Sequence, residues 1–352
     1  MDYFNRKLTR KEVLKRVGNM GQIAGAQRMI CAEGKGKGTS LIRVRNGGGL
    51  DFSVIPDRGM DILDVNYQGI PLAWISKNGL VRPGFFDDKD AGWLRSFGGG
   101  MLVTCGLRNV GIAVDTEDEH FGVHGRYTSL PATNVSISED WEDEEYVVVV
   151  SGRINEANTF GENLVVHRKI TVKSTCNEIL LEDRIINEGF RPEPVLLLYH
   201  LNWGSPLLEA DSILLLDPEA TRVRDNNAPE DSWNEFSEPV NGFKEVVYYH
   251  QLKKNADKMF GYELRNEKLG IGINVSWEPD ALPYLTQWKM MGEGEYVLGL
   301  EPGNCHPGGR VSELEEGRGD ILQPLEEKVV SLRIKFQDTL SKANRYRASY
   351  QQ

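Results

Sequence analysis

The sequence predicts an antiparallel all-β fold, a large β-sandwich with a short helix near the N-terminus. Short runs of alternating or continuous apolar residues, typical of strands, recur along most of the chain. Turn-forming segments such as Asn46-Gly47-Gly48-Gly49 separate these runs at hairpin spacing. Helical patterns that would connect parallel strands are almost absent after residue 25. Neighbouring strands are therefore expected to pair antiparallel.

The helical signals are confined to the beginning of the chain. Thr9 and Glu12 fit a capping box, and Gly18 stands where a helix of about two turns would end. We expect residues 1–25 to form a helical arm on a single domain that spans residues 1–352. No low-complexity linker divides the chain, and no fixed-period repeat suggests a propeller or a solenoid.

The expected strands follow in chain order. They are Ser40–Val44, Leu50–Ile55, Met60–Asn66, Pro71–Ile75, Tyr146–Ile154, Asn163–Val172, Glu178–Ile186, Pro194–Trp203, Ser212–Leu216, Glu245–Leu252, Met259–Leu264, Gly270–Trp277, Tyr284–Met290, Tyr296–Glu301 and Val329–Phe336. The acidic cluster Glu139–Glu145 is interpreted as a solvated loop.

Composition limits the functional class. The 352 residues are 40% hydrophobic and 26% charged, which is typical of a soluble globular protein with a large core. A net charge of −11 argues against nucleic acid and anionic membrane as partners. No stretch of 18 apolar residues and no N-terminal apolar signal core occurs, so we expect no membrane insertion.

The cysteine spacing indicates reduced thiols. The four cysteines lie at positions 31, 105, 176 and 305, without a CxxC pair. Disulfides and a zinc site are not expected, and the six histidines show no metal-ligand spacing. These features favour a cytoplasmic protein.

The run Pro194–Trp203 contains the first candidate functional groups. Strict alternation places His200 and Asn202 on one face of a strand whose other face is entirely apolar or aromatic. A histidine with an ordinary pKa of about 6.5 can donate or accept a proton near neutral pH. The alternative is a buried histidine with a purely structural hydrogen bond.

Glu301 ends a second strand of the same kind, just before a Pro302-Gly303 turn. Gly299 lies on the same face and leaves space beside the carboxylate. Burial would raise the pKa of this carboxyl group toward neutrality, which suits proton abstraction from a hydroxyl. The alternative is a salt bridge or a cap on the turn.

Three further residues are candidates for ligand contacts. His124 lies between two glycines in a loop, Arg58 lies at a strand-to-strand corner, and Gln287 shares a strand face with Leu285 and Lys289. Glycines allow close approach of a ligand, and arginine and amide side chains bind hydroxyls or carboxylates. Solvated loops and local ion pairs are the competing interpretations. The indole faces of Trp203 and Trp288 suit sugar C–H surfaces, although strand aromatics usually belong to a core.

Four segments together resemble the aldose 1-epimerases (galactose mutarotases) and their divergent relatives. They are Val123-His124-Gly125, Tyr199-His200-Leu201-Asn202, Gly299-Leu300-Glu301-Pro302 and Leu322-Gln323-Pro324-Leu325-Glu326. The resemblance implies a mutarotase-like supersandwich in which Glu301 takes the proton of the anomeric hydroxyl and His200 protonates the ring oxygen. It also implies that His124 and an arginine hold the sugar, with Arg58 preferred over Arg108.

The chain departs from that family in two places. Leu107-Arg108-Asn109 only partly matches the family's arginine segment, and the sugar-binding aspartate has no clear counterpart. His306, five residues after Glu301, is an additional candidate for the site. These departures indicate a divergent branch whose substrate differs from ordinary galactose or glucose.

We therefore expect a cofactor-free and metal-free carbohydrate 1-epimerase, monomeric or homodimeric, that acts on a free or acidic sugar. A non-catalytic sugar-binding or sugar-sensing sandwich is the first alternative. Glycoside hydrolysis is the second and needs two carboxylates, drawn from Asp57, Asp61 and Glu301. A sugar phosphate would require Arg58, Arg108 and Arg126 to converge.

Overall fold

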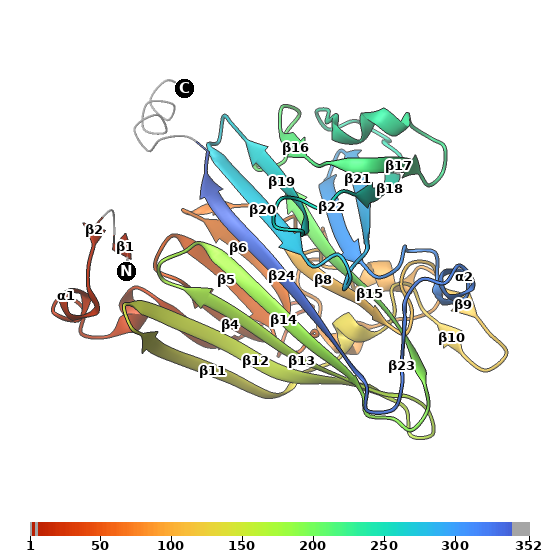
Figure 1. Ribbon diagram of the computed structural model, residues 1–352, viewed down its shortest axis with the longest axis horizontal. Helices are drawn as coiled ribbons and strands as arrows, with labels where there is room; N and C mark the ends of the chain where they lie inside the picture. Colours follow the sequence, from red (N-terminus) through yellow and green to blue (C-terminus); the bar gives the residue numbers. More distant parts are fainter. Residues whose placement is uncertain (1, 4–5, 340–352) are drawn as a thin grey trace.

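The computed structural model, which describes residues 2–3 and 6–339, consists mainly of two large antiparallel sheets packed face to face (Figure 1). The larger sheet has twelve strands and the smaller has eight. The prediction of an antiparallel all-β sandwich is confirmed.

The twelve-stranded sheet carries the candidate residues. Its strands are β3 (Gly25–Ile30), β4 (Ser40–Arg45), β5 (Leu50–Ile55), β6 (Asp61–Tyr67), β7 (Ile70–Pro71), β8 (Leu102–Leu107), β15 (Glu193–Gly204), β17 (Pro218–Val223), β18 (Val246–Leu252), β21 (Tyr284–Gly292), β22 (Glu295–Gly303) and β23 (Asp320–Leu322). The main order is β17-β18-β21-β22-β15-β8-β6-β5-β4-β3. Strand β15 therefore lies in the interior of the sheet, with β22 on one side and β8 on the other.

The eight-stranded sheet covers one face of the larger sheet. Its strands, in spatial order, are β11 (Thr133–Glu142), β12 (Glu145–Ala157), β13 (Asn163–Lys173), β14 (Glu178–Asn187), β24 (Glu327–Asp338), β20 (Ile271–Trp277), β19 (Phe260–Asn266) and β16 (Ile213–Leu215). Apolar side chains from both sheets form one large core cluster between them. The remaining elements are short: β1 (Asp2–Tyr3), β2 (Arg6–Lys7), β9 (Val114–Asp115), β10 (His120–Phe121), α1 (Arg10–Leu14), α2 (Arg310–Glu315) and five 3₁₀ turns (Met20–Gln22, Pro83–Phe85, Gly92–Arg95, Tyr127–Ser129, Glu230–Asn234).

A buried ion network joins the two sheets inside this core. Arg168 on β13 lies 3.0 Å from Asp61 on β6 and 2.6 Å from Asp183 on β14. The hydroxyl of Tyr199 on β15 also donates to Asp183, at 2.7 Å. Each buried charge is thus paired and hydrogen-bonded, as burial requires.

The N-terminal helix differs in length from the expectation. Thr9 and Glu12 form the predicted capping box, but α1 covers only Arg10–Leu14 and does not extend to Gly18. No helix in the described part of the chain is long and apolar enough to cross a membrane.

The interpretation of Glu139–Glu145 as a loop is wrong. Residues 139–142 belong to β11 and Glu145 begins β12, so only Asp143 and Glu144 form the turn. Strand β11 lies at the edge of its sheet and most of its side chains are exposed. An exposed edge strand needs few apolar residues, and the sequence pattern of such a strand resembles that of a loop.

Candidate functional site

The two faces of strand β15 contact two different apolar clusters. Leu197, Tyr199, Leu201 and Trp203 point into the main core between the sheets. Leu196 and Leu198 belong to a second, smaller apolar cluster on the opposite face of the sheet. By strand alternation His200 lies on this second face, so the predicted division of the strand is confirmed.

Glu301 lies beside His200 although about a hundred residues separate them in the sequence. In the β15–β22 register, Leu201 pairs with Leu300 and Leu198 with Gly303, so His200 falls opposite Glu301. His200 Nε2 is 3.2 Å from Glu301 Oε1, and the two residues are 5% and 2% exposed. The contact is at ion-pair distance but lacks hydrogen-bond geometry. Glu301 Oε1 therefore has no hydrogen-bond partner, and His200 Nδ1, on the other side of the imidazole ring, has none either.

Gly299 provides the space that this carboxylate occupies. A Cβ at residue 299 would lie 2.6 Å from Glu301 Oε1 and 3.1 Å from the Cβ of Trp288. Real Cβ contacts are essentially never this short, so any larger residue would displace the carboxylate. The absence of a side chain at residue 299 therefore allows the Glu301 carboxylate to take its observed position.

Burial shifts the two pKa values in opposite directions. It raises the pKa of Glu301 well above its usual range, and the nearby Glu245 carboxylate raises it further. It lowers the pKa of His200 to about 3, and His124 lowers it further. Between the two pKa values the pair holds a single proton and carries no net charge. One group can thus release a proton while the other accepts one.

Aromatic rings surround the imidazole of His200. The ring centroids of Trp288 and Phe97 each lie 5.5 Å from that of His200, and His124 lies at 5.9 Å. His124 in turn packs on Trp93 at 4.7 Å. The backbone N–H of Gly111 donates to His124 Nδ1 at 3.3 Å, and burial lowers the pKa of His124 to about 4. These rings bury the imidazole and present flat apolar surfaces next to the His200–Glu301 pair.

A row of cross-strand neighbours extends from Glu301 to the edge of the sheet. Glu301 is opposite Thr286 on β21, Thr286 is opposite Tyr249 on β18, and Tyr249 is opposite Arg222 on β17. Directly paired residues share a face, so all four lie on the His200 side. The Thr286 hydroxyl is buried without a hydrogen-bond partner. Sequence reasoning missed Thr286, Tyr249 and Arg222, because only the strand order aligns them with Glu301.

His306 lies beyond Glu301, near the outer part of this row. Its ring centroid is 4.2 Å from that of Tyr249 and 4.7 Å from that of Tyr284. Its Nδ1 atom is buried and unpartnered. Burial lowers the pKa of His306 to about 3, with Arg318 and Arg222 contributing. His306, an additional candidate from the sequence, thus lies against Tyr249, which is a member of this row.

Asn202 is also on the His200 side, opposite Gly299. Its side-chain amide donates to the carbonyls of Gly100 (2.9 Å) and His200 (3.1 Å), whereas Oδ1 is buried without a partner. Asn202 therefore fixes the backbone beneath His200 and retains one free acceptor.

Two other candidates, Arg58 and Gln287, are engaged elsewhere. Arg58 donates to the Val81 carbonyl at 2.7 Å and approaches Thr128 at 3.4 Å. Gln287 lies on the core side of β21, where its Oε1 is 2.9 Å from His250 Nε2 and its amide donates to Trp233. Among the contacts of residues 2–3 and 6–339, none joins either side chain to His200 or Glu301.

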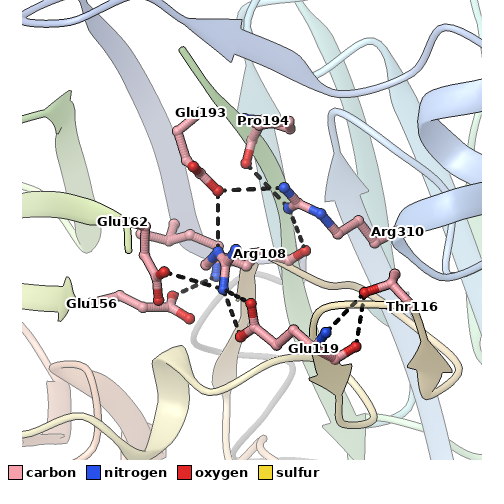
Figure 2. A network of polar contacts seen from close by, with 9 residues as sticks. Arg108, Thr116, Glu119, Glu156, Glu162, Glu193, Pro194 and Arg310 are labelled. Atoms are coloured by element: carbon pink, nitrogen blue, oxygen red, sulfur yellow. Dashed lines mark hydrogen bonds and ion pairs between the residues drawn. The ribbon is translucent and has the colours of Figure 1, made fainter. Parts of the chain in front are cut away.

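Arg108 belongs to an ion network at the end of β8 (Figure 2). Its guanidinium is 2.6 Å from Glu119, 3.2 Å from Glu162 and 3.1 Å from Glu193. Arg310 of α2 contacts the same Glu193 at 3.3 Å. Three carboxylates thus satisfy Arg108, and the network fastens α2 to the sheet.

Two further expectations concern groups of residues. Arg126 lies over the Phe86 ring at 5.9 Å, so Arg58, Arg108 and Arg126 occupy three separate environments and do not form one phosphate site. Trp203 donates its indole N–H to Tyr262 inside the main core, whereas Trp288 lies beside His200. Of the two indoles, only Trp288 can contact a ligand on this face.

The carboxylates considered for glycoside hydrolysis are also separated. Asp61 is buried against Arg168 and Thr104 in the core, and Asp57 accepts from the Ser40 N–H. Neither carboxylate faces Glu301 across a shared site. Within the described residues, no group of three or more His, Cys, Asp or Glu side chains is placed to hold a metal ion.

Solved structures identify the fold as that of the galactose mutarotase-like proteins. A Klebsiella pneumoniae protein provisionally named an aldose 1-epimerase has a TM-score of 0.85 and 23% identity, over 94% of this chain and 89% of that one. A galactose mutarotase-like protein from Clostridium acetobutylicum has a TM-score of 0.63 and 14% identity, over 90% and 99%. Galactose 1-epimerase from Lactobacillus acidophilus has a TM-score of 0.58 and 14% identity, over 90% and 100%. At these identities the likeness establishes the fold.

Within this fold class, residues 36–336 match the model of a family described as a domain of unknown function (DUF4432), and the chain belongs to that family. No curated protein matches the chain. The resemblance to aldose 1-epimerases seen in the sequence is confirmed as a structural relationship, and the family assignment is consistent with a divergent branch.

Proposed function

We propose that this protein is a carbohydrate isomerase of the aldose 1-epimerase type, with Glu301 and His200 as the catalytic pair. The observation that carries the proposal is the 3.2 Å contact between two buried titratable groups that each keep an unpartnered polar atom. Buried, unsatisfied titratable groups with shifted pKa values are typical of active sites. The fold shared with mutarotase-like proteins supports the same reaction class.

Anomer exchange needs only proton transfers, which this pair can supply. Hydrogen bonds from sugar hydroxyls to Glu301 favour its anionic form, and the shared proton then lies on His200. Glu301 removes the proton of the anomeric hydroxyl while His200 protonates the ring oxygen, and the C1–O5 bond breaks. Rotation about C1–C2 and reclosure by the reverse transfers give the other anomer. No net proton is gained or lost, which matches a pair that holds one.

The surrounding residues suit the binding of a sugar. Trp288 offers an apolar ring face to sugar C–H groups, and Thr286 and Asn202 have unpartnered oxygens available to its hydroxyls. We assign His124 and His306 as further substrate contacts. Arg58, Arg108 and Gln287 are assigned structural roles, because their polar atoms are engaged with carbonyls, carboxylates and His250.

The test is Glu301→Gln, which preserves the shape of the side chain and removes the base. We expect exchange between α and β anomers, followed by saturation-transfer NMR across hexoses, pentoses, uronic acids and sugar phosphates, to slow by about 10²- to 10⁴-fold. Sugar binding should persist because the amide still forms hydrogen bonds. Glu156→Gln is the matched control, since Glu156 is equally buried but lies in another part of the fold.

Two outcomes would contradict the mechanism. Unchanged exchange in Glu301→Gln would exclude Glu301 as the base. Saturable sugar binding without accelerated exchange in the unmodified protein would instead identify a non-catalytic sugar-binding sandwich.

A further inference from the structure

Arg222 stands at the outer end of the cross-strand row that begins at Glu301. It lies on β17, the edge strand of the large sheet, and pairs with Tyr249. Its guanidinium carbon is 4.8 Å from the centroid of the Tyr249 ring. The side chain therefore reaches inward across one strand, over the face that carries His200 and Glu301.

Arg222 is exposed, and the protein pairs its charge only weakly. The pKa of the Glu316 carboxylate, lowered mainly by its hydrogen bond with Arg318, is also lowered by the charge of Arg222. The neighbouring Arg224 is paired with Asp225 and Glu245, and Arg318 is paired with Glu313 and Glu316. In the described ranges, by contrast, no carboxylate lies within ion-pair distance of Arg222. The guanidinium of Arg222 is therefore accessible to a ligand as well as to solvent.

His306 provides a second polar group at the same place. It stacks on the Tyr249 ring at 4.2 Å, the ring over which Arg222 also lies. The His306 side chain is only 9% exposed, and its Nδ1 atom has no hydrogen-bond partner. A guanidinium and an unsatisfied imidazole around one tyrosine form a set of groups suited to an oxyanion.

The spacing matches the length of a sugar with a terminal anion. The Arg222 guanidinium lies above β18, and β18 is two strands from β22, roughly 10 Å at the spacing of neighbouring strands. A six-carbon sugar whose far end carries a phosphate or carboxylate covers this distance together with the hydrogen bonds at its two ends, each about 3 Å long. Thr286 lies between the two ends of the row, under the middle of such a ligand.

We propose that the substrate is an anionic sugar whose phosphate or carboxylate binds Arg222 and His306, while its anomeric centre lies at His200 and Glu301. This inference rests on the proposed function and specifies its substrate class. Because the arginines considered from sequence lie elsewhere, the anion is bound by an edge-strand residue that the sequence motifs do not include.

The test compares glucose, glucose 6-phosphate and glucuronate by anomer-exchange NMR and by calorimetric binding, in the unmodified protein and in Arg222→Gln. We expect kcat/KM to favour an anionic sugar over glucose, and this preference to fall by about 10- to 100-fold in Arg222→Gln, since the variant loses a charge-assisted hydrogen bond. Arg191→Gln, which alters an exposed arginine in the β14–β15 loop, should keep the preference. Comparison of glucose 6-phosphate with glucuronate identifies whether a phosphate or a carboxylate is bound.

The outcomes separate the two proposals. Rapid exchange of glucose with no preference for either anionic sugar overturns the anionic substrate while the epimerase assignment stands. A preference that Arg222→Gln retains overturns the assignment of Arg222 as the anion-binding residue and also leaves the epimerase assignment standing. Anionic-sugar binding that is lost in Arg222→Gln, without exchange of any sugar, supports the anion site and overturns the epimerase assignment. Absence of both binding and exchange overturns both.

Discussion

Gly299→Ala tests whether the position of the Glu301 carboxylate determines the reaction rate. The added Cβ would lie 2.6 Å from Glu301 Oε1, whereas an ordinary contact begins near 3.4 Å. The carboxylate must therefore move by about 0.8 Å, because its flexible end yields more easily than the backbone. A displacement of about 1 Å in a catalytic group costs on the order of 100-fold in rate. Overpacking against Trp288 should cost about 1–3 kcal/mol of stability.

The assay is anomer-exchange NMR on the best substrate, together with urea unfolding of each protein. Gly272→Ala on β20 is the control, since its Cβ would meet Thr339 Cγ2 at 3.1 Å and Arg265 Cβ at 3.3 Å in the other sheet. This variant should lose some stability and keep its exchange rate. A Gly299→Ala protein that is folded and exchanges anomers at the unmodified rate would refute the assigned role of the Glu301 position.

Two further predictions concern stability. Burial raises the pKa of Glu156 to about 7 from an ordinary 4.5, so the folded state binds this proton more tightly than the unfolded state. That contribution is fully present below about pH 4.5 and is lost as the pH rises through 7. Between pH 5 and pH 8 the free energy of unfolding should thus fall by about 2 to 3 kcal/mol more in the unmodified protein than in Glu156→Gln. An equal fall in the two proteins, measured by urea unfolding at each pH, would contradict this. Asp183→Asn removes the carboxylate that binds Arg168 and Tyr199, and should cost about 3–5 kcal/mol by the same assay. Asp51→Asn, at the exposed pair with Arg43, should cost less than about 1 kcal/mol, and equal losses in the two variants would show that burial of the pair is not decisive.

Local patterns in the sequence predict many of the strands and their faces. They miss β3, β8, β11 and β17, and they extend a strand over residues 71–75 where β7 covers only Ile70–Pro71. Alternation along residues 194–203 correctly separates the core side of β15 from the side that carries His200. The same rule correctly groups Gln287 with Leu285 and Lys289. It does not indicate which of the two faces meets the second sheet, and Gln287 proves to lie on the core side.

Long-range features of the site depend on strand order, which local patterns do not contain. Thr286, Tyr249 and Arg222 join Glu301 only because β22, β21, β18 and β17 are adjacent in the sheet. Likewise, the family resemblance offers Arg108 as a possible sugar-binding residue, but three glutamates from other segments satisfy its charge. Sequence reasoning identifies the type of each residue and misses the partners that decide its role.

For the ligand proposed above, the cross-strand row would set which lengths can bind. Neighbouring strands are separated by a fixed step of about 4.8 Å, so the distance from the proton-transfer pair to an anchoring residue can change only in whole steps. Moving the arginine from β17 to the position of Tyr249 on β18 would shorten the reach by one step and leave β15 and β22 unaltered. In the proposed binding mode, the strands that carry the proton-transfer residues therefore differ from the strand that sets the length of the ligand.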